Sequence, residues 1–435
     1  MERWGGPRSG RWFERLGIQR SGLLFLLLLW PMWPLYAEPA SPPVASPASA
    51  SPAAASQELA PIGSWSAVVA FDRHLFPSLL LVTSHPGFQL LRDKWQSEHP
   101  VLGEPFGWLS VIVQAPRDGC PVKVVVTSKN LMEESIFEGV IDDASEAFRI
   151  NPKIAWNFDA LPRYRQPSLE NITFEVFFDG RPAGRQVETV QVRSINDCPM
   201  AYADEETGEE LDTSWMMAAY VNEDHPWIDG LLKDALATKV IDGFYGYQTG
   251  EPADVLSQVF AIWYTLQRKG IRYSSIDPVS AYSDKITSQH VRFLDETITY
   301  EQANCLDGCV LLAAVLRKIG LEPFLVNTPS HVFLAFSLGA ETDEIAFLET
   351  TRLGELDIKQ TEPDPATGPR ALARRKVKEA KDVDKSWRSF SAALEAGEEA
   401  FAAIRKRIML HDPDHPVIDI GAARRQGVMP IAFRH

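Results

Sequence analysis

The chain has 435 residues, of which 45% are hydrophobic and 23% are charged, an ordinary composition for a globular protein of two or three domains. Its formal net charge at pH 7 is −15, and a negative chain repels polyanions, so we expect no nucleic-acid partner. The apolar content is sufficient for a sizeable buried core.

The N-terminal segment 1–37 has the pattern of a secretory signal. Five arginines and two glutamates precede the apolar run 22–36, which Pro31 interrupts. The uninterrupted part is shorter than the roughly 20 residues that a spanning helix needs. We expect cleavage near Ala37 and export to the periplasm or the extracellular space. An uncleaved signal anchor is the alternative, and residues 22–36 would then form a membrane tether.

Residues 38–62 are rich in alanine, proline and serine. Such a composition cannot build a core, so this segment is predicted to be an extended linker. It would hold the folded part away from the signal segment.

Residues 63–205 are predicted to form an immunoglobulin-like β-sandwich, because short β-branched and aromatic runs alternate with turn signals. The predicted strands are 65–71, 108–115, 122–128, 172–178 and 187–195. No catalytic constellation is found there, so we expect this domain to bind or to space. Cys120 and Cys198 lie in this region and could pair after export, although the sequence leaves that pairing open.

The next segment changes to helical periodicity. Residues 255–270 carry an apolar stripe at helical spacing, and Gly270 ends it. We interpret this stripe as core.

A second helix is predicted to begin at Cys305. Asn304 is a favourable N-cap, and an apolar stripe follows until Gly320. Cys305 therefore lies in the first turn, where unpaired N–H groups and the helix dipole favour a thiolate and can stabilise an oxyanion. Cys309, one turn later, is interpreted as a buried hydrophobic residue.

Three short strands are predicted after this helix, at 324–327, 331–336 and 345–351. His331 begins the second strand, and Glu349 lies near the end of the third. In an antiparallel pair the start of one strand faces the end of the next, so Glu349 can orient the imidazole. Asp343, Glu344 and Asp357 are the alternatives for this role.

Residues 366–435 are predicted to be a C-terminal helical extension. Residues 371–407 have the periodicity of one or two amphipathic helices, and the tail 411–430 is rich in turn signals.

The stretch around Cys305 contains short motifs in a fixed order. They are Ala303-Asn304-Cys305, Asp307, Gly320-Leu321-Glu322-Pro323, His331-Val332-Phe333 and Leu348-Glu349-Thr350-Thr351, with Arg292 upstream. In these motifs the chain resembles the transglutaminase-like superfamily, and most closely a bacterial branch whose third strand reads Leu-Glu-Thr-Thr. The resemblance implies a papain-like α+β catalytic core, which we assign to residues 215–365. Ala303 replaces the common glycine, and Glu349 replaces the usual aspartate.

These residues would perform acyl transfer through a thioester. Cys305 would attack an amide or ester carbonyl, and His331 would take the thiol proton and donate it to the leaving amine. Glu349 would hold the imidazole tautomer. The Cys305 N–H would stabilise the oxyanion with Gln302 as a candidate second donor, and Asp307 would cap the helix or support the site. This chemistry needs no metal or organic cofactor.

We therefore expect an exported transglutaminase-like cysteine enzyme acting on the peptide or isopeptide bonds of a peptide or protein substrate, with hydrolysis favoured. An isopeptide-forming transglutaminase is one alternative. A catalytically silent module that binds peptide or envelope polymer is another. The remaining alternative is a purely structural Cys305.

Overall fold

The computed structural model describes residues 63–91, 97–203, 208, 210–275, 283–342, 344–357 and 367–431. It has a mixed α+β architecture with several sheets, which confirms the coarse fold class. The predicted signal segment, the membrane tether 22–36 and the linker 38–62 lie outside the described residues. Within the described part of the chain, no helix is long and apolar enough to cross a membrane.

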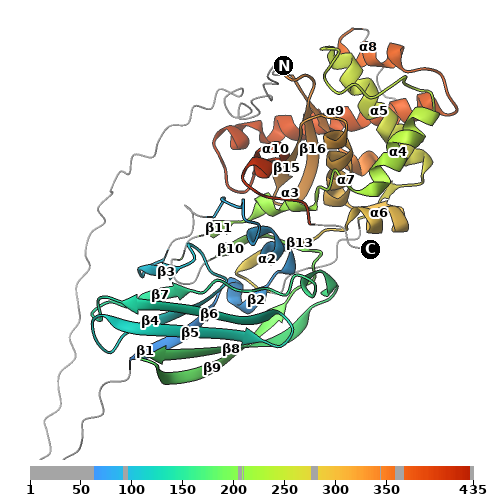
Figure 1. Ribbon diagram of the computed structural model, residues 1–435. Coiled ribbons are helices and arrows are strands. Elements are labelled where there is room, and N and C mark those ends of the chain that lie inside the picture. Colours follow the sequence, from blue (N-terminus) through green and yellow to red (C-terminus); the bar gives the residue numbers. More distant parts are fainter. Residues whose placement is uncertain are drawn as a thin grey trace, which may run out of the picture.

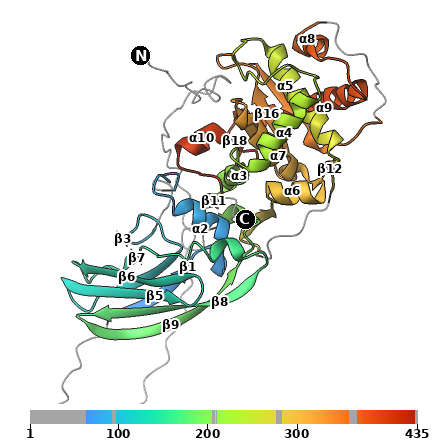
Figure 2. The ribbon, with the colours of Figure 1, turned by 45° about the vertical axis from the view of Figure 1, so that its right-hand side comes forward.

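The N-terminal half contains two sheets, which lie one over the other in Figures 1 and 2. The first has the order β2 (His74–Leu75), β9 (Arg181–Val192), β8 (Ser168–Phe178), β5 (Cys120–Ser128) and β6 (Met132–Ile141). The second has the order β1 (Ser64–Val69), β4 (Leu109–Gln114), β7 (Phe148–Asn151) and β3 (Val101–Gly103). Every second residue of β8 from Ile172 to Phe178 is buried, as expected where one face of a strand meets a core.

All five strands predicted for this half are present, with ends shifted by a few residues. The sequence did not predict β6, β7 or the helix α2 (Pro77–Thr83). The considered disulfide is absent, because Cys120 and Cys198 are both free and buried. Their thiols lie near the carbonyl oxygens of Pro121 and Pro199, the residues that follow them.

A third sheet joins the two halves of the molecule. Its order is β11 (Glu210–Asp212), β10 (Asp197–Ala203) and β13 (Ile286–His290), all antiparallel. β10 ends the N-terminal half, whereas β13 belongs to the segment just before the Cys305 helix. The segment predicted as catalytic is thus hydrogen-bonded to the β-rich half through its backbone.

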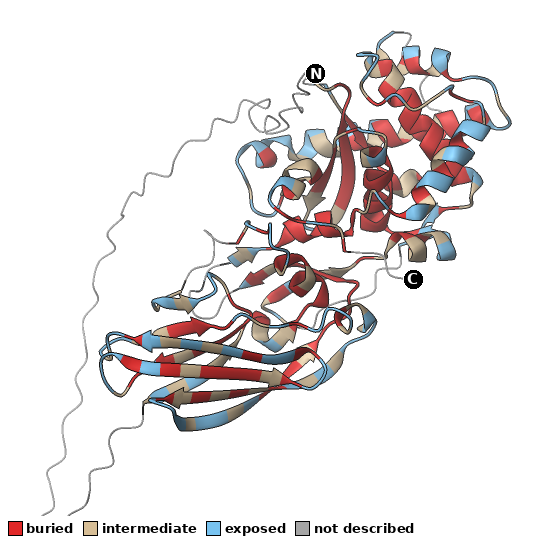
Figure 3. Cartoon of the chain, viewed as in Figure 1, coloured by how far each residue is buried: buried red, intermediate tan, exposed pale blue. Residues whose placement is uncertain are grey.

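The C-terminal half is built around a four-stranded antiparallel sheet. Its order is β17 (Ile345–Leu348), β16 (His331–Ser337), β15 (Pro323–Thr328) and β18 (Val417–Asp419). Alternate residues of β16 face opposite sides: Val332 and Leu334 pack with α7 (Cys305–Lys318), whereas Phe333 packs with α9 (Val383–Met409). The sheet therefore lies between these two helices, and Figure 3 shows its strands as buried.

The other elements complete this half. They are η4 (Ser214–Met216), α3 (Met217–Tyr220), α4 (Pro226–Ala237), α5 (Pro252–Arg268), α6 (Leu294–Tyr300), α8 (Pro369–Lys376), α10 (Ile420–Arg425) and the parallel pair β12 (Arg272–Tyr273) with β14 (Gln302–Ala303). α5 is buried along most of its length, in accord with the predicted core stripe.

The C-terminal tail differs from its prediction as a run of turns. Residues of β18 pair with β15 at the edge of the central sheet, and α10 follows directly. A three-residue strand is too short to give a periodic signal, which explains why the sequence did not reveal it. The tail is therefore part of the same sheet that carries His331.

Candidate active site

The first turn of α7 holds Cys305 at a well-capped helix start. The Asn304 side chain accepts a hydrogen bond from the Asp307 N–H at 2.8 Å, and the Asp307 carboxylate accepts one from the Asn304 N–H at 3.1 Å. This reciprocal capping box fixes the backbone around Cys305. Cys305 itself is 8% exposed.

Asp307 also joins the helix to the segment between β13 and α6. Its carboxylate accepts hydrogen bonds from the Arg292 N–H at 2.8 Å and from the Arg292 guanidinium at 2.7 Å. Burial raises the pKa of Asp307, and the hydrogen bonds from Arg292 and Asn304 partly offset that shift. The structure thus places Asp307 in the helix cap, one of its two predicted roles.

His331 lies at the start of β16, next to the hairpin that joins β15 and β16. Its Nε2 lies 2.6 Å from Oε2 of Glu349, which leaves Nδ1 for a second partner. A hydrogen bond with the Cys305 side chain and then one with Glu349 raise the pKa of His331 to about 10. An imidazolium is therefore favoured in the neutral range.

Glu349 lies just after β17 and not within a strand, so the predicted third strand 345–351 is three residues too long. Its Oε1 accepts hydrogen bonds from the N–H and the hydroxyl of Thr351, at 3.0 and 2.8 Å. Burial would raise the pKa of Glu349, but the hydrogen bonds from His331 and Thr351 outweigh it and lower that pKa. Of the proposed carboxylates, Glu349 is the one bonded to His331, while Asp343 lies outside the described residues.

Thr350 is a site residue to which the sequence assigned no role. Its buried hydroxyl donates to the carbonyl oxygen of Cys305 at 3.2 Å and lies 3.5 Å from the sulfur of Cys309. A Cβ on Gly308 would lie only 3.0 Å from that hydroxyl oxygen, so glycine permits this close approach. Thr350 therefore fixes the first turn of α7 against the segment that carries Glu349.

Cys309 is buried, as predicted. Burial raises its pKa well above the usual value for a thiol. Its sulfur also lies 3.5 Å from the carbonyl oxygen of Val332. A buried thiol of this kind is a poor nucleophile, which separates it from Cys305.

A cleft of about 930 Å³ opens beside the sulfur and the imidazole, and both Cys305 and His331 line it. The sheet β11-β10-β13 forms one wall, and the β15–β16 hairpin with the turn after α9 forms the other. Gln302 is exposed on β14 and is not among the described residues that line the cleft. Its role as an oxyanion donor stays a prediction.

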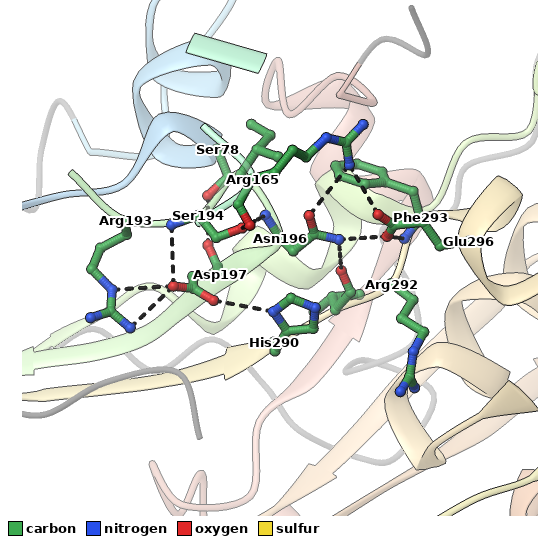
Figure 4. Close-up of polar contacts among 12 residues, drawn as sticks. Ser78, Arg165, Arg193, Ser194, Asn196, Asp197, His290, Arg292, Phe293 and Glu296 are labelled. Atoms are coloured by element: carbon green, nitrogen blue, oxygen red, sulfur yellow. Dashed lines mark hydrogen bonds and ion pairs between the residues drawn. The ribbon is translucent and has the colours of Figure 1, made fainter. Parts of the chain in front are cut away.

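A polar cluster at the junction of the two halves supports this wall (Figure 4). The buried Asp197 accepts hydrogen bonds from Arg193, at 3.1 Å, and lies 3.4 Å from the His290 ring. Asn196 donates to the Val291 carbonyl at 2.9 Å and to the Glu296 carboxylate at 2.6 Å. These contacts tie β10 to the segment that runs from β13 into Arg292.

Among the described residues, no group of three or more histidine, cysteine, aspartate or glutamate side chains is arranged to hold a metal ion. A scan against models of protein families and a search of curated proteins found no match to this chain.

Proposed function

We propose that this chain is an exported cysteine enzyme of the transglutaminase-like kind, which acts on peptide or isopeptide bonds through a thioester. The observation that carries the proposal is the His331 imidazole, hydrogen-bonded to Glu349 at 2.6 Å and to Cys305 beside an open cleft. A nucleophile, a base and an orienting carboxylate in series are the arrangement that this chemistry requires.

The reaction would proceed in two halves. The Cys305 thiolate bonds to the carbonyl carbon, and the carbonyl π electrons move to oxygen, which the N–H groups at the helix start stabilise. When the oxyanion collapses, the C–N bond breaks and the leaving nitrogen takes the proton held on His331. Water then gives a proton to His331 and adds to the thioester. The C–S bond breaks, releasing the carboxylic acid and restoring the sulfur.

The finer fold assignments belong to the same proposal. A cysteine at a helix start, packed on a sheet that carries histidine and then a carboxylate, supports a papain-like core. Two facing sheets of mainly antiparallel strands support an immunoglobulin-like reading of residues 63–205. Export is supported by the sequence of residues 1–37 alone.

The acyl group could instead pass to an amine, which would make the chain an isopeptide-forming transglutaminase. Both reactions share the thioester, so the distinction depends on whether water or an amine reaches it. Hydrolysis is the simpler proposal for an isolated exported enzyme. A catalytically silent binding module is the remaining alternative, and the bonded Cys305, His331 and Glu349 side chains speak against it.

The first test is the reactivity of the two thiols in α7 towards iodoacetamide. We expect Cys305 to be alkylated faster than Cys309, because Cys309 is fully buried. Fragmentation of the shared peptide separates the two positions by mass. Labelling of Cys305 should fall in His331→Ala and stay unchanged in the control His85→Ala, which lies in the N-terminal half. Equal, slow labelling of both thiols would argue for a structural Cys305.

The second test distinguishes an enzyme from a binding module. Peptide libraries incubated with the protein should yield new N-termini or ammonia, and Cys305→Ala should abolish both products. Addition of a primary amine diverts the acyl group to an amide only if transamidation is possible. Peptide binding without any product would favour the silent module.

A further inference from the structure

The charge of the cleft beside Cys305 and His331 indicates which substrates the proposed active site favours. The described residues that line it include three carboxylates, Glu210 and Asp212 on β11 and Asp414 in the turn after α9. Lysine and arginine are absent from the described lining. The His331 imidazolium is the one cationic group there, and Glu349 neutralises it.

The three carboxylates are available to a ligand. Each is exposed, and none has an ion-pair partner among the described residues. Asp212 accepts one hydrogen bond from the Ser214 N–H at 2.9 Å, which keeps its side chain at the cleft. Because Glu210 and Asp212 lie on one wall and Asp414 lies on the other, a chain bound between the walls meets negative charge on both sides.

A cleft lined by one sign of charge concentrates its field, since the low-dielectric walls reduce screening by water. An anionic segment would be repelled there, while an ammonium or guanidinium group would replace its water contacts by charge-assisted hydrogen bonds. The same cleft holds the nucleophile Cys305. The cationic side chain of the substrate should therefore lie close, along the substrate chain, to the carbonyl that Cys305 attacks.

We propose that the acyl donor is a peptide with a lysine- or arginine-type side chain next to the scissile carbonyl, and that Glu210, Asp212 and Asp414 determine this specificity. The inference rests on the proposed function, because it assumes that Cys305 attacks a carbonyl bound in this cleft.

The test uses two peptidyl acyloxymethyl ketones that differ in one residue, lysine or the neutral norleucine, beside the ketone. The Cys305 sulfur bonds to the methylene carbon and the carboxylate leaves with the bonding electrons, so mass spectrometry reports the labelling rate. We expect the lysine probe to react about tenfold faster, as several partly exposed charge contacts allow. Raising the salt concentration should reduce this advantage.

The advantage should disappear in the triple variant Glu210→Gln, Asp212→Asn and Asp414→Asn, while the norleucine probe keeps its rate. A matched control removes three exposed carboxylates elsewhere, in Glu133→Gln, Glu134→Gln and Glu399→Gln, and should keep the lysine advantage. The two variants have the same net charge. If both lose the lysine advantage, the advantage comes from the overall charge of the protein, and the assignment to these three residues is wrong.

Equal rates for the two probes in the wild type, with His331-dependent labelling of Cys305, would overturn the specificity and leave the proposed function standing. If instead butylamine is incorporated into a peptide substrate in a Cys305-dependent reaction while the lysine probe has no advantage, the carboxylates serve an amine acceptor, and the acyl-donor proposal is wrong. Absence of His331-dependent labelling by either probe would overturn the function and the inference together.

Discussion

At the scale of single residues, the two oxygens of the Glu349 carboxylate make different contacts. Oε2 holds the imidazole, and Oε1 is held by two hydrogen bonds from Thr351. The backbone N–H of Glu349 donates to the Ala393 carbonyl in α9 at 2.9 Å. Glu349 thus reaches His331 from a backbone position just beyond the end of β17, and its carboxylate is fixed at both oxygens.

Replacing Glu349 by glutamine should lower the pKa of His331 from about 10, because a neutral amide no longer stabilises the imidazolium. The His331 pKa in the fold is above its ordinary value of 6.5, so the pair stabilises the folded state fully below about pH 6.5. This contribution is lost as the pH rises through about 10. The stability difference between wild type and Glu349→Gln should therefore shrink between these values.

NMR titration of the His331 ring measures the pKa, and urea unfolding at pH 7 and pH 10.5 measures the stability difference. A His331 pKa that is the same in both proteins would contradict the role assigned to the carboxylate.

Thr350 offers a second residue-scale prediction. Thr350→Val keeps the shape but removes the hydroxyl that donates to the Cys305 carbonyl. We expect a loss of about 1 kcal/mol in the free energy of unfolding and slower alkylation of Cys305. Thr350→Ser retains the hydroxyl and should restore the alkylation rate. If valine and serine variants alkylate equally fast, Thr350 does not position the thiol.

At the scale of elements, α9 holds the segment that carries Glu349. A Cβ on Gly397 would lie 2.5 Å from the carbonyl carbon of Phe347, at the end of β17. Helix and strand can approach this closely only because glycine has no side chain. The C-terminal helix is thus a support for the candidate site and not an appendage.

Gly397→Ala should destabilise the protein by about 1–3 kcal/mol, since the strand must move to admit the methyl group. Gly230→Ala in α4 is the matched control, because its Cβ would meet no atom within 4 Å. That control should gain up to about 1 kcal/mol from helix propensity. Thermal unfolding compares the two variants with the wild type. A Gly397→Ala variant as stable as the wild type would show that the β17 segment moves to admit the methyl group without cost.

The elements that the sequence predicted best are those with local signals. The α7 helix has its cap, its apolar stripe and its closing glycine within one short stretch, and the structure places its start at Cys305 as predicted. β6 was missed because half of its residues are exposed and three of them are glutamates, which hides the strand pattern. The role of Thr350 was also missed, because it depends on a contact between residues 45 positions apart.

At the scale of the whole molecule, the two halves share backbone hydrogen bonds between β10 and β13 and the polar cluster around Asn196. One wall of the cleft is the sheet β11-β10-β13 that joins the two halves, so residues of both halves line the cleft. We interpret the halves as one cooperative unit, although their sequences predict two domains.

We expect the protein to unfold in a single transition. Calorimetry and far-UV circular dichroism should both report that transition at the same temperature. Asn196→Ala should lower the stability by about 1–3 kcal/mol, because it leaves the buried partners of Asn196 with unmet hydrogen bonds. Asn171→Ala, on an exposed position of β8, is the control and should change little. Two separate transitions, with only one shifted by the Asn196 variant, would mean that the halves unfold independently.

All four thiols of the chain are free and buried. Folding of the described region thus needs no oxidising step, and no isomerase has to sort cysteine pairs. The recombinant protein should be obtainable from a reducing cytoplasm without refolding, and its stability should be indifferent to added dithiothreitol. A reductant can accordingly remain during purification and storage to keep the reactive sulfur from oxidising, and it is removed before the alkylation assays.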